Sequence, residues 1–264
     1  PYLEAILQFQ KLTPDAMLVG AFETAFHQTI PLERRIYGIP WEWYEEYGIQ
    51  RLGYHGASHS YVAETLTDMY GSTGKAISCH LGGSGSLCAI DDGKSVDTSF
   101  GISLQVGVIQ SNRCGDIDPF IVPFLQKKGL SLDQVLDGLT KRGGLLGISG
   151  VSNDLRDVQE AADAGNERAR LAIDVFCNGI VRHIGAYYAE LGGLDHLVFT
   201  GGIGEHGTRI REAVCHQLKH MGILLDDEKN QSCTGANTVI SRTDSPVTIH
   251  VIPANEELGV ARKT

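Results

Sequence analysis

The feature that most constrains the fold is a strand–turn–strand pattern at residues 76–101, AISCHLGGSGSLCAIDDGKSVDTSFG. An apolar run at 76–79 leads through His80 into a turn rich in glycine and serine, and a second apolar run at 87–90 ends in a hairpin-type DDG turn. Because glycine adopts positive φ and lets the chain approach closely, such a loop can present backbone N–H groups to an anion such as phosphate. His80 can donate a hydrogen bond to the same anion. The alternative interpretation is an ordinary tight hairpin with a buried histidine.

A second pattern of this kind lies closer to the C-terminal end of the chain. A buried strand predicted at 194–200 runs into the glycine turn GGIGE at 201–205, and a helix is predicted at 208–221. A strand, a glycine turn and a helix in this order place an anion or nucleotide at a helix N-terminus. Together with the hairpin, the alternation of strands and helices predicts an α/β fold with a mixed sheet flanked by helices.

Three further elements are predicted from the hydrophobic pattern. Residues 16–21 (AMLVGA) have the composition of a buried strand. Residues 58–69 have helical spacing, with Ser58 as the expected N-cap. Residues 167–191 form a long amphipathic pattern that predicts a single helix.

Composition excludes several classes of function. The 264 residues, 42% of them hydrophobic, suffice for one large domain or somewhat more. A net charge of −10 without a basic block argues against nucleic acid as a partner. The apolar runs are far shorter than the roughly 20 residues of a membrane helix, and no signal peptide pattern is present. The six cysteines form no C-x-x-C pair, which indicates reduced thiols and a cytoplasmic protein.

Seven segments, in order, resemble the acetate kinase family, which includes propionate and butyrate kinases. They are FETAFHQTIP (22–31), LGYHGASHSYV (52–62), CHLGGSGSLCAIDDGKSVDTSFG (79–101), NRCGDIDP (112–119), SGVSNDLRDV (149–158), FTGGIGEH (199–206) and IPANEELGVAR (252–262). The resemblance implies the two-domain fold of actin, the sugar kinases and the Hsp70 ATPases, built on a ribonuclease H-like domain. It also implies reversible transfer of the γ-phosphoryl group of ATP, with Mg²⁺, to acetate or a similar short carboxylate, giving an acyl phosphate and ADP.

The resemblance also divides the chain into expected parts. Family members begin with a further segment that carries a first phosphate-binding hairpin, and nothing in this sequence corresponds to it. Residues 1–25 are expected to be a remnant of the first domain with a crossover strand, 26–252 the second, nucleotide-binding domain, and 253–264 a segment that returns toward the first domain. The chain alone is therefore expected to turn over poorly. The family's homodimers imply an interface through the second domain, although the apolar stripe at 167–191 would serve an internal core equally well.

Phosphoryl transfer requires in-line positioning and donors or cations around the equatorial oxygens. The resemblance makes Arg113 a clamp for phosphoryl and carboxylate groups, which a planar guanidinium binds bidentately. It makes His55 a donor to the transferring phosphoryl group and His80 a contact of the nucleotide phosphates or the transition state. The alternatives are a structural Arg113, paired with Asp116 or Asp118, and core histidines with satisfied hydrogen bonds.

Nucleotide and metal contacts follow from the same resemblance. The residues expected to bind nucleotide are His80, Gly82, Gly83, Ser84, Gly85, Asp154, Leu155, Arg156, Gly202, Ile203, Gly204 and His206. Glu23 and Glu256 are the expected metal ligands, because Mg²⁺ takes one or two carboxylates besides phosphate oxygens and water. The alternative for both is a solvated or helix-capping acid.

Three positions in the expected site depart from the family pattern. Glu23 stands where the family has Asp, and Gly83 and His206 stand where it has Asn. These departures, with the absent N-terminal segment, motivate a second hypothesis, a nucleotide-binding relative with little or no turnover. A weaker third hypothesis is a fold relative that acts on another substrate, such as a sugar or a longer carboxylic acid.

Overall fold

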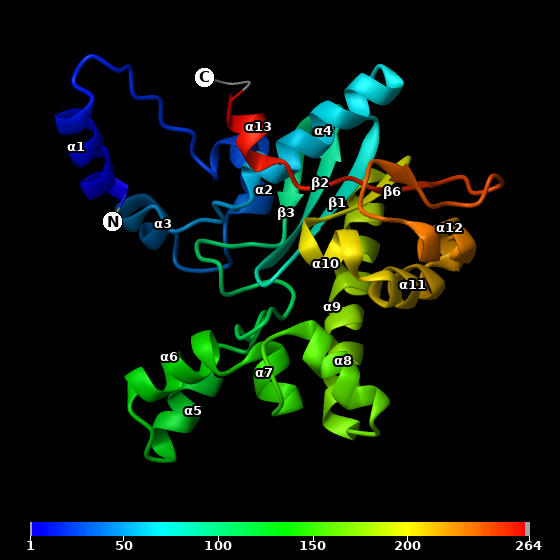
Figure 1. Ribbon diagram of the computed structural model, residues 1–264. Helices are drawn as coiled ribbons and strands as arrows, with labels where there is room; N and C mark the ends of the chain where they lie inside the picture. Colours follow the sequence, from blue (N-terminus) through cyan, green and yellow to red (C-terminus); the bar gives the residue numbers. More distant parts are fainter. Residues whose placement is uncertain (1, 262–264) are drawn as a thin grey trace.

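The computed structural model describes residues 2–261, and a six-stranded mixed sheet forms its centre (Figure 1). The strand order is β3-β2-β1-β4-β6-β5. The strands are β1 (Lys75–Leu81), β2 (Gly85–Asp91), β3 (Lys94–Thr98), β4 (His196–Thr200), β5 (Thr238–Val239) and β6 (Thr248–Val251). β1, β4 and β6 run parallel, whereas β2, β3 and β5 pair antiparallel with their neighbours. The predicted α/β fold with a mixed sheet is confirmed, as is the hairpin of β1 and β2.

Helices lie on both faces of this sheet, and others project from it. The helices are α1 (Tyr2–Leu12), η1 (Ala25–Thr29), α2 (Leu32–Arg35), α3 (Trp41–Tyr47), α4 (Gly56–Tyr70), α5 (Ile121–Lys127), α6 (Leu132–Lys141), α7 (Gly144–Ser149), α8 (Leu155–Asp163), α9 (Glu167–Leu191), α10 (Gly201–His206), α11 (Thr208–Gln217), η2 (Lys219–Met221), α12 (Asp227–Ser232) and α13 (Glu256–Ala261). α9 contacts β1 and β2 on one side, and α4 contacts β1 on the other (Figure 1). The long helix predicted at 167–191 is confirmed as α9.

Alternation along the strands creates two cores. Ile77 and Cys79 of β1 belong to the larger core, to which α9 contributes Phe176 and Ile180. Ala76 of β1 belongs to the smaller core on the α4 side, with Val62, Leu66, Cys88, Ile90 and Val198. Because both faces are buried, the central strands are largely apolar, although β1 carries the buried Ser78 and β2 the buried Ser86. The site lies at the strand ends.

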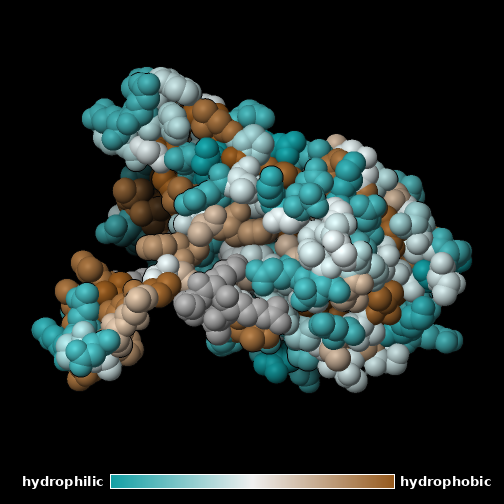
Figure 2. Space-filling view, turned by 90° about the horizontal axis from the view of Figure 1, so that it is seen from above, coloured by the Kyte–Doolittle hydropathy of each residue, from teal (hydrophilic) through white to brown (hydrophobic). Residues whose placement is uncertain are grey.

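The predicted strand at 16–21 is wrong. Residues 13–22 are exposed and lie in no helix or strand, and Met17 is 90% exposed. Hydrophobic side chains are also exposed on α1, including Leu3 and Phe9, and Figure 2 shows such residues on the part of the molecule that projects from its body. An apolar run forms a strand only beside a neighbour that completes its hydrogen bonds, and within residues 2–261 no strand pairs with this run.

Two predicted helix starts also differ from the structure. α4 begins at Gly56 with His55 as N-cap, so Ser58 lies inside the helix and does not cap it. The predicted glycine turn at 201–205 is itself helical, as α10, after Gly201 turns the chain with φ 75°. A Cβ on Gly201 would lie 2.8 Å from the carbonyl oxygen of Leu81, so glycine at this position lets the end of β4 approach the β1–β2 hairpin.

Candidate active site

Two histidines lie face to face where α4 begins and β1 ends. His55, the N-cap of α4, has the left-handed backbone conformation φ 56°, ψ 27°, which is uncommon outside glycine and often marks functional sites. Its ring stacks on that of His80 with 4.1 Å between the centroids and 29° between the planes. His80 is held by a hydrogen bond of 2.8 Å between its Nδ1 and Ser58 Oγ. The structure therefore brings together two residues that the sequence predicted as partners on one ligand.

Both imidazoles are neutral at ordinary pH. Burial lowers the pKa of His55 to about 3, and the nearby charges of His80, His27 and Arg113 act in the same direction. Burial alone lowers the pKa of His80 to about 4. A stacked pair of imidazolium ions would repel, so neutrality is consistent with the geometry. Neutral imidazoles can each donate one hydrogen bond to an anion without a proton being transferred.

The two predicted metal ligands lie beside these histidines. Glu256, at the start of α13, has its Oε1 3.9 Å from His80 Nδ1. Burial raises the pKa of Glu256, and the charge of Glu23 raises it further, followed by that of Glu257. Glu23 Oε2 accepts a hydrogen bond of 3.5 Å from the backbone of Ala57 and lines a cavity of about 400 Å³ with that residue. Carboxylates that disfavour each other's charge favour a cation between them.

Arg113 approaches the same region from the loop before α5. Its Nη1 donates to Ser84 Oγ at 3.1 Å and to Gln110 Oε1 at 3.0 Å. No ion pair of Arg113 is found among residues 2–261, and Asp116 and Asp118 instead accept hydrogen bonds from backbone N–H groups. The structural alternative for Arg113 is therefore not supported, and its guanidinium keeps its charge available to an anion.

A cavity of about 640 Å³ opens beside the Gly/Ser loop. The residues on its wall that were predicted to bind nucleotide are Gly82, Gly83, Asp154, Leu155, Arg156, Gly202, Ile203 and His206. Four other residues that were predicted to bind nucleotide do not line this cavity: His80, Ser84, Gly85 and Gly204. Ser84 bonds Arg113, Gly85 begins β2, and Gly204 is buried in α10, where a Cβ would lie 3.2 Å from the backbone of Phe199.

Several residues around this cavity were not predicted. Ser111, Asn153, Gln159 and Gly207 complete its wall. Asn153 lies within the motif at 149–158 and Gly207 follows the motif at 199–206, so both could have been included on that ground. Ser111 precedes the motif at 112–119 and Gln159 follows the motif at 149–158, so the same signal could have found them.

Asp154 and Arg156 are fixed to one another at the start of α8. Asp154 caps the helix by accepting from the backbone N–H of Arg156 at 2.9 Å, and its carboxylate also bonds the Arg156 guanidinium. These bonds hold the pKa of Asp154 low, at about 2. A capped helix end presents rigid backbone at this wall of the cavity.

Comparison with known proteins places the chain in a family. The model of the acetokinase family matches residues 1–262. The chain belongs to the acetokinase family. It is 47% identical to acetate kinase of Carboxydothermus hydrogenoformans over 268 residues, covering 100% of this chain and 67% of that protein. It is 49% identical to propionate kinase of Citrobacter rodentium over 258 residues, covering 96% of this chain and 63% of that protein.

Solved structures of this family share the fold. The crystal structure of Porphyromonas gingivalis acetate kinase superposes with a TM-score of 0.95 at 39% identity, covering 99% of this chain and 67% of that one. A propionate kinase from Francisella tularensis gives a TM-score of 0.93 at 37% identity, covering 100% of this chain and 68% of that one. The predicted fold class and family are thus confirmed, and the chain spans about two thirds of the length of these acetokinase relatives.

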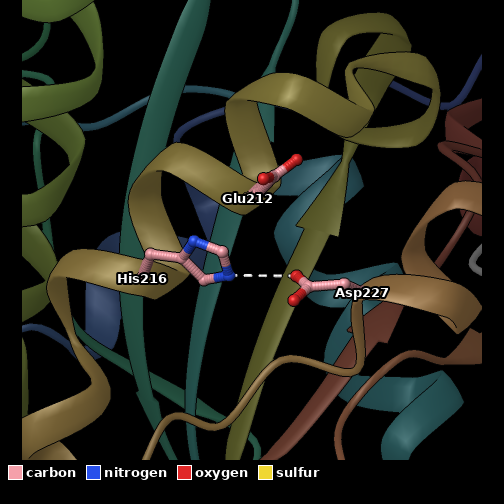
Figure 3. Close-up of side chains that lie close together, drawn as sticks. All are labelled: Glu212, His216 and Asp227. Carbon is pink, nitrogen blue, oxygen red and sulfur yellow. Dashed lines mark hydrogen bonds and ion pairs between the residues drawn. The ribbon is translucent and has the colours of Figure 1, made fainter.

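A separate group of possible metal ligands lies away from this site (Figure 3). Glu212 and His216 on α11 and Asp227 on α12 place one ligand atom each within 4.8 Å of one another. His216 Nε2 and Asp227 Oδ1 are hydrogen-bonded at 2.9 Å. None of the three lines the cavity beside the Gly/Ser loop, so the group ties α11 to α12 rather than completing the site.

No helix in the described part of the chain is long and apolar enough to cross a membrane.

Proposed function

We propose that this chain catalyses, as part of an acetokinase, reversible transfer of the γ-phosphoryl group of ATP to acetate or a similar short carboxylate. The products are an acyl phosphate and ADP. The observation that carries the proposal is the convergence of His55, His80, Arg113 and Glu256 at one end of the sheet, next to a cavity lined by the Gly/Ser loop. Donors, a guanidinium and carboxylates around one site are the requirements of phosphoryl transfer.

The nucleotide is proposed to lie in this cavity. Asp154 to Arg156 and the start of α10 form the wall for adenosine, and the backbone at Gly82 and Gly83 forms the wall for phosphates. Arg113, which bonds Ser84 of the same loop, supplies positive charge to the transferring group. The neutral imidazoles of His55 and His80 supply hydrogen bonds to its equatorial oxygens.

Mg²⁺ is proposed to be held by Glu23 and Glu256. The charge of Glu23, which raises the pKa of Glu256, supports a cation at this point, and two carboxylates leave room for phosphate oxygens and water. When bound, Mg²⁺ would neutralise charge on the phosphates of ATP. The longer side chain of Glu23 in place of Asp changes the reach of this ligand and leaves its charge unchanged.

The remaining proposals concern the domain boundaries, the oligomeric state and the cellular compartment. Residues 26–252 are proposed to be the nucleotide-binding domain, with 1–25 and 253–264 belonging to the other domain. That domain would cover the exposed apolar side chains at 3–22. A homodimer through the second domain is proposed from family membership. All six cysteines are free, which supports the cytoplasm as the compartment.

The test is detection of acyl phosphate as the hydroxamate. The full-length protein with ATP, Mg²⁺ and acetate, propionate or butyrate is expected to give hydroxamate at a rate within the ordinary range for kinases, roughly 1–100 s⁻¹. ATP without a carboxylate serves as control. Binding of ATP without product from any of the three acids would contradict the proposal and support the relative with little or no turnover.

A further inference from the structure

A row of hydrogen bonds runs from the protein interior to His55. Ser86 Oγ lies 2.9 Å from His55 Nδ1 and 2.9 Å from His59 Nε2. The other ring nitrogen of His59, Nδ1, lies 2.9 Å from Ser78 Oγ. His59, Ser78 and Ser86 are 0% exposed, so these side chains depend on one another and on His55 for their hydrogen bonds.

The protons in this row point the same way, because if both imidazoles donated to Ser86, its own hydroxyl proton would have no acceptor among residues 2–261. A hydroxyl has one proton, and a neutral imidazole has one donor and one acceptor nitrogen. In one arrangement Ser78 donates to His59 Nδ1, His59 Nε2–H donates to Ser86, and Ser86 donates to His55 Nδ1. In the other arrangement every bond is reversed, and His55 Nδ1–H donates to Ser86.

Ser78 decides between the two arrangements. In the reversed row its hydroxyl only accepts from His59, so its own proton needs another acceptor. Within residues 2–261, Ser78 Oγ has no hydrogen-bond partner besides His59 Nδ1. An unpaired buried donor is unfavourable, so the first arrangement is favoured. Burial also lowers the pKa of His59 well below its usual value and that of His55 to about 3, which keeps both rings neutral, as this scheme requires.

We propose that His59 and Ser86 are positioning residues that hold His55 as the tautomer with its proton on Nε2. Ser86 occupies Nδ1 as a donor, and the stack on His80, with 4.1 Å between the centroids, fixes the ring plane. His55 Nε2 bonds no residue in the described part of the chain, so its N–H is available to a ligand. The catalytic consequence rests on the proposed function: this N–H donates to the phosphoryl group, whereas the opposite tautomer would direct a lone pair at an anion.

The tautomer can be measured without turnover by ¹⁵N–¹H NMR spectra of the imidazole groups of the full-length protein. We expect the proton of His55 on Nε2 in the unchanged protein and a mixture of tautomers in Ser86→Ala. A proton on Nδ1 in the unchanged protein, or the same tautomer in both proteins, would overturn the proposal. Because this readout needs no product, a protein without kinase activity still tests it.

A matched pair of variants at His59 tests the consequence and serves if Ser86→Ala does not fold. Glutamine places an amide near the position of Nε2 and can still donate to Ser86, whereas asparagine places it near Nδ1 and cannot. We expect kcat to fall on the order of 10- to 100-fold in His59→Asn and Ser86→Ala, with KM for ATP unchanged and His59→Gln close to the unchanged protein. Equal losses in the two His59 variants, or a change in KM alone, would show a merely structural role.

Discussion

Replacing Arg113 with alanine is expected to lower kcat for acyl phosphate formation by about three orders of magnitude or more, the scale found for arginines that stabilise phosphoryl-transfer transition states. The guanidinium of Arg113 bonds two neutral oxygens, those of Ser84 and Gln110. Its charge is therefore not consumed within the protein and is available to the transferring group. Both oxygens can be satisfied by water in the variant, so the fold is expected to persist.

The measurement is the rate of hydroxamate formation at saturating ATP and acetate, with circular dichroism to confirm folding. Arg113→Lys keeps the charge without the planar fork and is expected to recover only a small part of the activity. Arg209→Ala is the matched control. Arg209 bonds the exposed Asp163 at 2.8 Å, and neither residue lines the cavity. A kcat of Arg113→Ala within tenfold of the unchanged protein would remove Arg113 from the mechanism.

Acidification from pH 7 to pH 5 is expected to destabilise the protein, above the range in which ordinary carboxylates are protonated. Burial lowers the pKa of His27 and of His250 to about 4, and that of His59 well below its usual value. In the unfolded chain these groups titrate near pH 6.5. Because the folded pKa is the lower one, the stability that neutral histidines confer is complete above about pH 6.5 and is lost as the pH falls toward 4.

The size of this effect follows from the lowered pKa values of His27 and His250. Each histidine with a folded pKa of about 4 removes about 2 kcal/mol from the free energy of unfolding between pH 7 and pH 5. Several such groups together approach the whole stability of a typical domain, about 5–15 kcal/mol. Glu190 acts in the opposite direction, because burial raises its pKa to about 7, but its side chain is 30% exposed and its effect is reduced by solvent screening.

Urea denaturation at pH 7, 6 and 5 measures the predicted loss. The free energy of unfolding is expected to fall by several kcal/mol across this range, and more steeply in Glu190→Gln, which removes the opposing group. Replacing the exposed His220 with glutamine is the matched control and is expected to leave the slope unchanged. Equal free energies of unfolding at pH 7 and pH 5 would contradict the account.

The parts of the fold that sequence predicts are those whose pattern is local. The β1–β2 hairpin follows from two apolar runs around a glycine turn, and α9 from a periodic stripe over its whole length. The run at 16–21 has the same composition as a buried strand, yet it is exposed. Whether an apolar run becomes a strand depends on a neighbour elsewhere in the protein, which local composition does not contain.

Prediction of the candidate site from the sequence is limited in the same way. The resemblance of the motifs to the acetate kinase family predicted roles for His55, His80, Arg113 and Glu256 in binding phosphate and metal. Ser86 lies within one of these motifs without a predicted role, since its function arises only when β2 places it between His55 and a helical histidine. Contacts between polar side chains from different elements are set by strand register and helix rotation, and a single sequence carries no direct signal of either.

The most direct test of the central claim is a crystal structure of the full-length protein with ADP, Mg²⁺ and acetate. Adenosine is expected between Asp154–Arg156 and the start of α10, with the phosphates on Gly82 and Gly83 and directed toward Arg113 and His55. Nucleotide bound at any other surface, with the cavity beside the Gly/Ser loop empty, would contradict the account.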